Sequence, residues 1–122
     1  MLNNFYSIKS KQIEKTTAKY NISFNREHSI YAAHFPNNPI TPGVCLIQVC
    51  KELTENMVEN SLFLQTIKNV KFLNIINPSE TPDVRVSLSV TKHESEHKVN
   101  AVILGENENV FAKLSLIFNL KL

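Results

Sequence analysis

The sequence has little of several features that would place it in other classes of protein. It contains no Trp, two Gly and two Cys, and its formal net charge is only +2 at pH 7. So small a net charge gives no reason to expect a nucleic-acid or membrane-surface partner. No uninterrupted apolar run exceeds four residues, as in Val44–Ile47 and Ala101–Leu104. A run of four is far too short for a transmembrane helix, so membrane insertion is not expected.

The first residues also lack the apolar stretch of a signal peptide. We therefore expect a cytoplasmic protein with reduced thiols. Leu, Ile, Val and Phe together make up 40 of the 122 residues, well above the roughly 20% below which chains tend to stay disordered. A chain of this length fits one domain, which we expect to span residues 1–122.

Most of the apolar residues that are present alternate with polar ones, which is typical of strands with one buried face. Two further segments, Lys98–Leu104 and Leu62–Ile76, are rich in β-branched residues, Leu and Phe, and are also predicted to be extended. In the second, the uneven apolar register around Ile67 and Val70 indicates a bulge. The alternating segments are 18–24, 84–90 and 112–120.

One segment follows a helical pattern instead. From Val44 to about Glu59 the apolar residues recur at helical spacing. Thr41 is a plausible N-cap, with Pro42 at the first helical position. Because the first turn is apolar almost all round, we expect the helix to start deep inside the protein and to emerge toward water. One helix across an antiparallel sheet predicts an α+β layer architecture.

The run His93-Glu94-Ser95-Glu96-His97 matches the H-E-x-x-H pattern of zinc proteases. That chemistry needs both His on one face of a helix. Here the flanking segments are predicted strands, so we interpret the five residues as a hairpin tip and expect no metal site.

The segment 31–44 carries the functional prediction. Three of the five Pro and one of the two Gly fall within eight residues, on a loop that leads into the helix. The loop would hold His34 near the helix N-terminus, whose free N–H groups can stabilise a developing oxyanion. An imidazole base beside such a site suits proton abstraction next to a carbonyl. The alternative is a His retained only for packing.

The runs His34-Phe35-Pro36, Pro39-Ile40 and Pro42-Gly43-Val44 resemble the H-F-P-G-x-P-x-x-P-G-V signature of the beta-hydroxyacyl-acyl-carrier-protein dehydratases. These are hot-dog proteins, in which an antiparallel sheet wraps around one central helix. The downstream run 71–80 resembles the family's basic-aromatic strand and the turn after it, and the order of elements agrees from about Lys15 to Leu120.

The resemblance implies a lyase of fatty-acid biosynthesis that removes water from a 3-hydroxyacyl thioester. His34 would be the base, and the N–H of Gly43 would polarise the thioester carbonyl. The implied partners are acyl carrier protein or coenzyme A, whose phosphopantetheine carries the substrate, with no other cofactor. A homodimer or higher oligomer with active sites at its interface is also implied. The residues expected to contact the acyl substrate are Phe35, Pro42, Val44 and Ile47.

The helix departs from the family pattern at the position of the general acid. Where the family has Glu, this chain has Gln48, and where the family has Gln it has Glu52. An amide has no proton to give at neutral pH. Gln48 is either an amide that orients the substrate or a neutral replacement in a silent site. Glu52, one turn further on, is either a surface helix residue or a displaced acid.

Three functions therefore stay open from the sequence. The protein is a dehydratase, a catalytically silent binding subunit that completes the site of a paralogous partner, or a hot-dog acyl thioesterase. Docking of an acyl carrier protein needs basic residues, for which Lys68, Lys71 and Lys92 are candidates. Cys45 and Cys50 are most simply small core residues.

Overall fold

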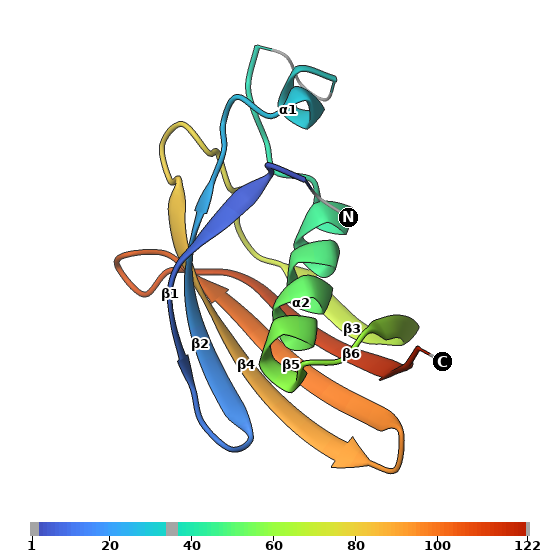
Figure 1. Ribbon diagram of the computed structural model, residues 1–122. Helices are drawn as coiled ribbons and strands as arrows, with labels where there is room; N and C mark the ends of the chain where they lie inside the picture. Colours follow the sequence, from blue (N-terminus) through green and yellow to red (C-terminus); the bar gives the residue numbers. More distant parts are fainter. Residues whose placement is uncertain (1–2, 34–36, 122) are drawn as a thin grey trace.

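The computed structural model describes residues 3–33 and 37–121, in which two strands are followed by two helices and then by four more strands (Figure 1). The predicted base His34, with Phe35 and Pro36, lies outside the described residues. The elements in chain order are β1 (Tyr6–Ile13), β2 (Thr17–Phe24), α1 (Ser29–Ala33), α2 (Gly43–Val58), β3 (Leu62–Phe72), β4 (Asp83–His93), β5 (Glu96–Leu104) and β6 (Val110–Leu120).

The strands form one six-stranded sheet in the order β1-β2-β4-β5-β6-β3, and every recorded strand pair is antiparallel. The sheet curves around α2 (Figure 1). The predicted α+β architecture is therefore confirmed. β1 was not predicted from the sequence, because it lies at an edge and seven of its eight residues are exposed, so no alternation marks it.

β3 forms the other edge of the sheet, and its pairing with β6 is irregular. The register shifts between Leu64 and Thr66 and again between Ile67 and Asn69. The bulge predicted near Ile67 is thus confirmed, and a second irregularity precedes it. β-bulges bend a strand and change which face its side chains occupy. This explains why the apolar pattern of β3 does not alternate cleanly.

The H-E-x-x-H run is a hairpin tip, as predicted. His93 ends β4 and pairs with Glu96, which begins β5, and the two residues between them form the turn. The two His side chains differ in environment, since His93 is exposed whereas His97 is only 2% exposed. The Nδ1 atom of His97 lies 3.1 Å from the carbonyl oxygen of Ser95.

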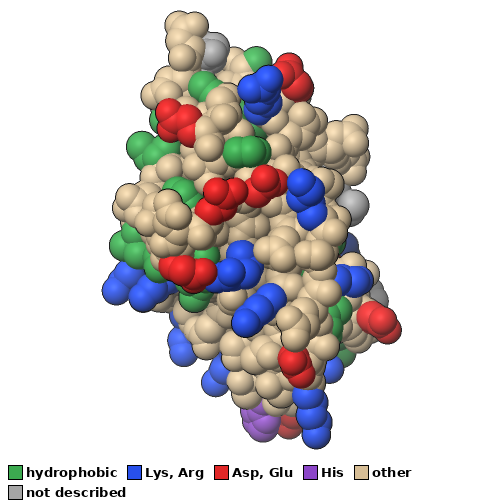
Figure 2. Space-filling model, turned by 90° about the vertical axis from the view of Figure 1, so that its left-hand side faces the viewer, with side chains coloured by type: hydrophobic (Ala, Val, Ile, Leu, Met, Phe, Trp, Pro, Cys, Tyr) green, Lys and Arg blue, Asp and Glu red, His purple; other side chains and the backbone are tan. Residues whose placement is uncertain are grey.

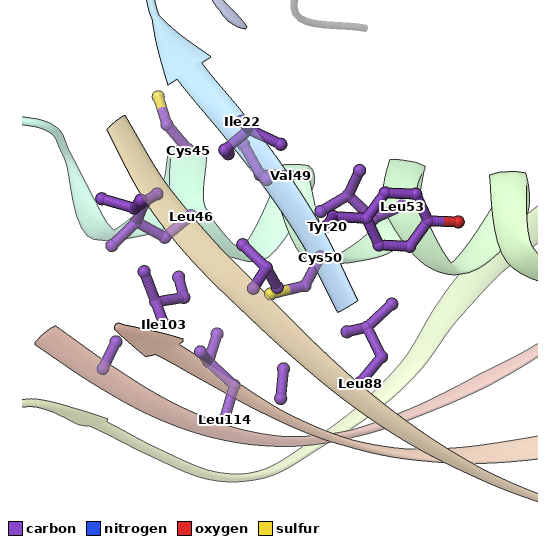
Figure 3. Packing of buried hydrophobic residues seen from close by; sticks show 14 of the residues in the cluster. Tyr20, Ile22, Cys45, Leu46, Val49, Cys50, Leu53, Leu88, Ile103 and Leu114 are labelled. Carbon is purple, nitrogen blue, oxygen red and sulfur yellow. The ribbon is translucent and has the colours of Figure 1, made fainter. Parts of the chain in front are cut away.

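The core lies between α2 and the inner face of the sheet (Figure 3). α2 buries Cys45, Leu46, Val49, Cys50 and Leu53 at the spacing of one helical face. The other side of the core comes from alternate residues of the central strands, among them Tyr20, Ile22, Leu88, Ile103 and Leu114.

The predicted course of the helix from the interior to water is wrong. Val44, in its first turn, is 72% exposed, whereas Leu53, near its end, is fully buried. The helix lies along the sheet and buries one face over its whole length, so its first turn is not enclosed. Within the described ranges, neither helix is long and apolar enough to cross a membrane.

The connection into α2 also differs from the prediction. Residues Ser29–Ala33 form the short helix α1, and the N-cap of α2 is Pro42 rather than Thr41. The Thr41 hydroxyl is buried and lies 2.9 Å from the hydroxyl of Tyr31. The Thr41 side chain therefore contacts Tyr31 of α1 instead of capping α2.

Candidate active site

The N-terminus of α2 presents backbone N–H groups that its own helix does not use. Pro42 has extended backbone angles (φ −63°, ψ 142°), and among the described residues no side chain caps this end. The first intrahelical bonds run from the N–H groups of Cys45 and Leu46 to the carbonyl of Pro42. The N–H of Gly43, the first helical residue, lies at the positive end of the helix dipole. A carbonyl oxygen placed there would be polarised.

Gly43 is closely approached by an aromatic ring. A Cβ atom built at this position would lie 2.6 Å from Cζ of Phe72, the last residue of β3. Real Cβ atoms essentially never approach another heavy atom so closely. The absence of a side chain thus lets the Phe72 ring lie over the first turn of α2.

Exposed apolar side chains gather around the same helix end. Phe72 is 51% exposed although its ring approaches Gly43, and Val44 is 72% exposed. Leu73 and Ile75, which follow β3, are 51% and 67% exposed. Contiguous exposed apolar groups of this kind mark binding or interaction surfaces. The N–H groups of the α2 N-terminus are therefore bordered by an apolar surface.

One turn into α2, three polar side chains form a hydrogen-bonded chain. The Nε2 of Gln48 donates to Oε2 of Glu52 at 2.9 Å, and the hydroxyl of Tyr6 donates to Oε1 of Glu52 at 3.0 Å. All three residues are partly buried. Burial, together with the adjacent Glu52 carboxylate, raises the pKa of Tyr6 well above its usual range. Glu52 is therefore partly exposed, and both of its carboxylate oxygens accept hydrogen bonds.

The other predicted site residues are placed as follows. Pro42 and Gly43 begin α2, and Ile47 is partly buried against the core. Cys45 and Cys50 are buried core residues, as predicted. Burial raises the pKa of both thiols, that of Cys50 to about 12. Neither thiol is poised to act as a nucleophile at neutral pH.

Tyr6 is the member of this site that the sequence analysis missed. It comes from β1 and lies 46 positions before Glu52 in the sequence. No local spacing in the sequence brings the two together. By contrast, Gln48 and Glu52 are four residues apart on one helix, a spacing that itself predicts contact.

A cavity of about 600 Å³ lies at the opposite end of α2. It lies beside Met57 and Val58 of the helix, between the turn that joins β1 to β2 and the end of β4. Pro42, Val44 and Ile47 do not line it. The cavity is therefore separate from the candidate site.

Charged side chains on the face shown in Figure 2 are of both signs. Lys and Arg (blue) gather mainly in its lower half and are intermixed with Asp and Glu (red). Of the basic residues expected to dock an acyl carrier protein, Lys68 and Lys71 are exposed on the edge strand β3, and Lys92 lines the cavity at the far end of α2. Their docking role stays a prediction.

The curved antiparallel sheet around one central helix defines a hot-dog protein, and solved structures of that fold match it. The dehydratase heterocomplex ApeI:P from Xenorhabdus doucetiae superimposes with a TM-score of 0.74 at 13% identity, covering 93% of this chain and 96% of the other. The putative thioesterase yhdA from Lactococcus lactis gives a TM-score of 0.69 at 13% identity, covering 96% and 94%. At such identities the likeness shows the fold alone.

The family follows from the sequence comparisons. The model of the ApeI-like family, described as ApeI dehydratase, matches residues 9–113. The chain therefore belongs to the ApeI-like dehydratase family. It is also 30% identical over 91 residues to the 3-hydroxyacyl-[acyl-carrier-protein] dehydratase FabZ of Rickettsia canadensis (strain McKiel), and 28% identical over 86 residues to that of Latilactobacillus sakei subsp. sakei (strain 23K). These alignments span 64% and 60% of the relatives' own length.

Proposed function

We propose that this protein removes water from a 3-hydroxyacyl thioester to give the 2-enoyl thioester. The observation that carries the proposal is the start of α2 at Pro42 and Gly43, which no described side chain caps and which exposed apolar side chains border. In the sequence, the segment that contains His34 precedes it. Membership in the ApeI-like dehydratase family supports the same reaction.

In the proposed mechanism, the N–H of Gly43 donates a hydrogen bond to the thioester carbonyl oxygen and so stabilises the enolate that develops there. His34 removes a proton from C2. The electrons of the C2–H bond form the C2=C3 double bond as the bond between C3 and the hydroxyl oxygen breaks. The departing hydroxide takes the proton from the His34 imidazolium and leaves as water. His34 is then neutral again.

Gln48 has the supporting role of an acceptor for the substrate 3-hydroxyl. Because its Nε2 donates to Glu52, the Oε1 of the same amide faces the other way. An acceptor of this kind orients the C3–O bond but supplies no proton. Pro42, Val44, Ile47 and Phe35 are the proposed contacts of the acyl chain.

The proposed substrate is carried on the phosphopantetheine arm of an acyl carrier protein or of coenzyme A. The names of the FabZ relatives support the acyl carrier protein. A place in fatty-acid metabolism and a cytoplasmic location follow from the same inference and stay predictions.

We also propose that the working form is a dimer built on β3. This edge strand exposes Phe63, Leu64, Ile67 and Phe72 by 36–51%, and an apolar edge strand of this length is prone to pair with another chain. A second β3 added to this edge would cover these side chains and the apolar surface beside Gly43.

The test is turnover of a short 3-hydroxyacyl thioester, followed by the absorbance of the enoyl product. We expect His34→Ala to abolish turnover, because no other group in the proposal takes the C2 proton. His93→Ala, on the exposed β4–β5 hairpin, is the matched control and should stay within about twofold of the unsubstituted protein. Undiminished activity in His34→Ala would rule out the assignment of the base.

Gln48 favours a second candidate, a silent subunit that completes the site of a Glu-bearing paralogue. The structure of similar fold that is named as the dehydratase heterocomplex ApeI:P supports this candidate. A silent subunit would give no turnover alone and would restore turnover on mixing with its paralogue. Release of free thiol without enoyl product would instead indicate a thioesterase.

A further inference from the structure

The hydrogen bonds around Glu52 determine the orientation of the Gln48 amide. Gln48 is the first polar residue on the outer side of α2, and Glu52 follows one turn later. The 2.9 Å bond from Gln48 Nε2 to Glu52 Oε2 directs the NH₂ group toward the C-terminal end of the helix. The Oε1 atom, on the opposite side of the planar amide, is directed away from Glu52.

A second strand residue holds Glu52 itself. The hydroxyl of Tyr6, from β1, donates to Oε1 of Glu52 at 3.0 Å. Tyr6 is partly buried and packs against the core, so its ring position is fixed by its surroundings. Each carboxylate oxygen of Glu52 therefore accepts a bond from a different element of the fold.

Glu52 is the acceptor in both of these hydrogen bonds. A protonated carboxyl group would place its own O–H on one of the two oxygens and compete with one of the two donors. Bonds to an ionised acceptor are also shorter and stronger than bonds between neutral groups. Glu52 is thus held as an acceptor of two hydrogen bonds, and the displaced-acid hypothesis for it is not favoured.

We infer that Tyr6 and Glu52 are positioning residues that fix the Gln48 side chain so that its Oε1, and not its NH₂, meets the 3-hydroxyl of the substrate. The inference rests on the proposed function for the identity of that substrate group. It assigns to Tyr6 and Glu52 no contact with the reacting atoms.

The first test uses Glu52→Gln, which changes one atom of the carboxylate. The introduced amide can still accept from Tyr6, but it then directs its own NH₂ at Gln48. Gln48 must turn its Oε1 toward that NH₂ and present a donor to the substrate in place of an acceptor. We expect kcat to fall about 10- to 100-fold, because misplaced groups at a reacting centre cost rate on this scale. KM should change by less than about threefold.

Tyr6→Phe should lower kcat by a smaller factor, about three- to tenfold, since Glu52 keeps its bond from Gln48. The matched control is Tyr20→Phe. The Tyr20 hydroxyl also reaches α2 from a neighbouring strand, but it donates to Oδ1 of Asn56 at 2.7 Å. This control should leave kcat within about twofold.

The second test needs no substrate. In a ¹⁵N-resolved NMR spectrum, the side-chain NH₂ signals of Gln48 are identified by their loss in Gln48→Leu. Glu52→Gln and Tyr6→Phe should shift these signals, and Tyr20→Phe should not. If the shifts occur while the unsubstituted protein shows no dehydration, the orientation stands and the proposed function fails. If neither variant shifts the Gln48 signals, or Glu52→Gln keeps full kcat in an active enzyme, the inference is overturned.

Discussion

At residue 48, one side-chain atom separates an acceptor from an acid. Gln48 and Glu have nearly the same shape, so the position keeps its reach toward the substrate while it loses a titratable proton. The neighbouring Glu52 makes this difference larger, because it lies within hydrogen-bond distance of the same side chain. The substitution Gln48→Glu is therefore a direct way to restore the acid.

We predict that Gln48→Glu raises the rate of dehydration at least about tenfold, in line with the contribution of a general acid. The introduced carboxyl would lie next to the Glu52 carboxylate, and two adjacent carboxylates share a proton, which raises the pKa of one of them. A general acid acts in its protonated form. The rate of the variant should therefore fall as the pH rises through that raised pKa, as a profile of kcat against pH would show.

The double variant Gln48→Glu with Glu52→Gln is the control for this explanation. It keeps the introduced acid but removes the neighbouring charge, so the descending limb of the profile should move to lower pH. A gain in rate without this movement would contradict the shared proton. The absence of any gain from Gln48→Glu would show that the missing acid is not what limits the site.

The same residues show how far a sequence predicts a site. The Gln48–Glu52 contact follows from helical spacing, and the place of Gly43 at the helix start follows from the run of Pro and Gly. Tyr6 does not follow, because its contact with Glu52 joins segments 46 residues apart. The partial burial of Glu52 does not follow either, since helical periodicity does not reveal which strand lies beside the helix.

At the scale of elements, the connection between α1 and α2 determines how the chain enters the candidate site. The hydroxyl groups of Tyr31 and Thr41 lie 2.9 Å apart, and these residues are only 3% and 6% exposed. The ring of Tyr31 stacks on Phe5, with centroids 5.6 Å apart. The N–H of Thr41 also donates to the carbonyl of Ile76 at 2.9 Å. The two ends of the segment between α1 and α2 are thus held together.

We predict that Tyr31→Phe and Thr41→Val each lower the free energy of unfolding by about 1–3 kcal/mol, because each leaves one buried hydroxyl without its partner. The double variant should lose less than the sum of the two, since it removes both hydroxyls together. Urea unfolding of the four proteins measures the coupling. Tyr20→Phe, whose hydroxyl bonds an exposed Asn56, is the control and should cost less. Strictly additive losses would contradict a direct bond.

Elements differ in how well the sequence predicts them, for a physical reason. The alternating segments within β2, β4 and β6 were predicted because one face of each packs on the core. β1 exposes seven of its eight residues, and α1 is a single helical turn, so neither carries a periodic apolar signal. The same reasoning accounts for the N-cap, where the burial of Thr41 against Tyr31 outweighs its preference for capping.

At the scale of the whole molecule, the two edges of the sheet are not equivalent. β1 exposes Ile8 and Ile13 by 40% and 43%, and charged Lys9 and Lys11 lie between them. β3 carries exposed Lys68 and Lys71 as well, but it exposes a larger apolar set, which continues past its end through Leu73 and Ile75. Native edge strands are commonly protected by charged residues or covered by another chain. The difference points to β3 as the edge that a second copy covers.

We predict that Ile67→Lys, in the middle of β3, converts the proposed dimer into a monomer and lowers dehydration at least about tenfold, because a charge buried in an apolar interface is costly. Ile8→Lys places the same charge on the opposite edge, at a residue of similar exposure, and should change neither property. Light scattering behind a sizing column gives the mass, and the enoyl absorbance gives the rate on the same samples. Circular dichroism confirms that each variant keeps its sheet.

A dimer that survives Ile67→Lys but is lost in Ile8→Lys would place the interface on β1. A monomeric Ile67→Lys with full activity would show that one chain holds the complete site.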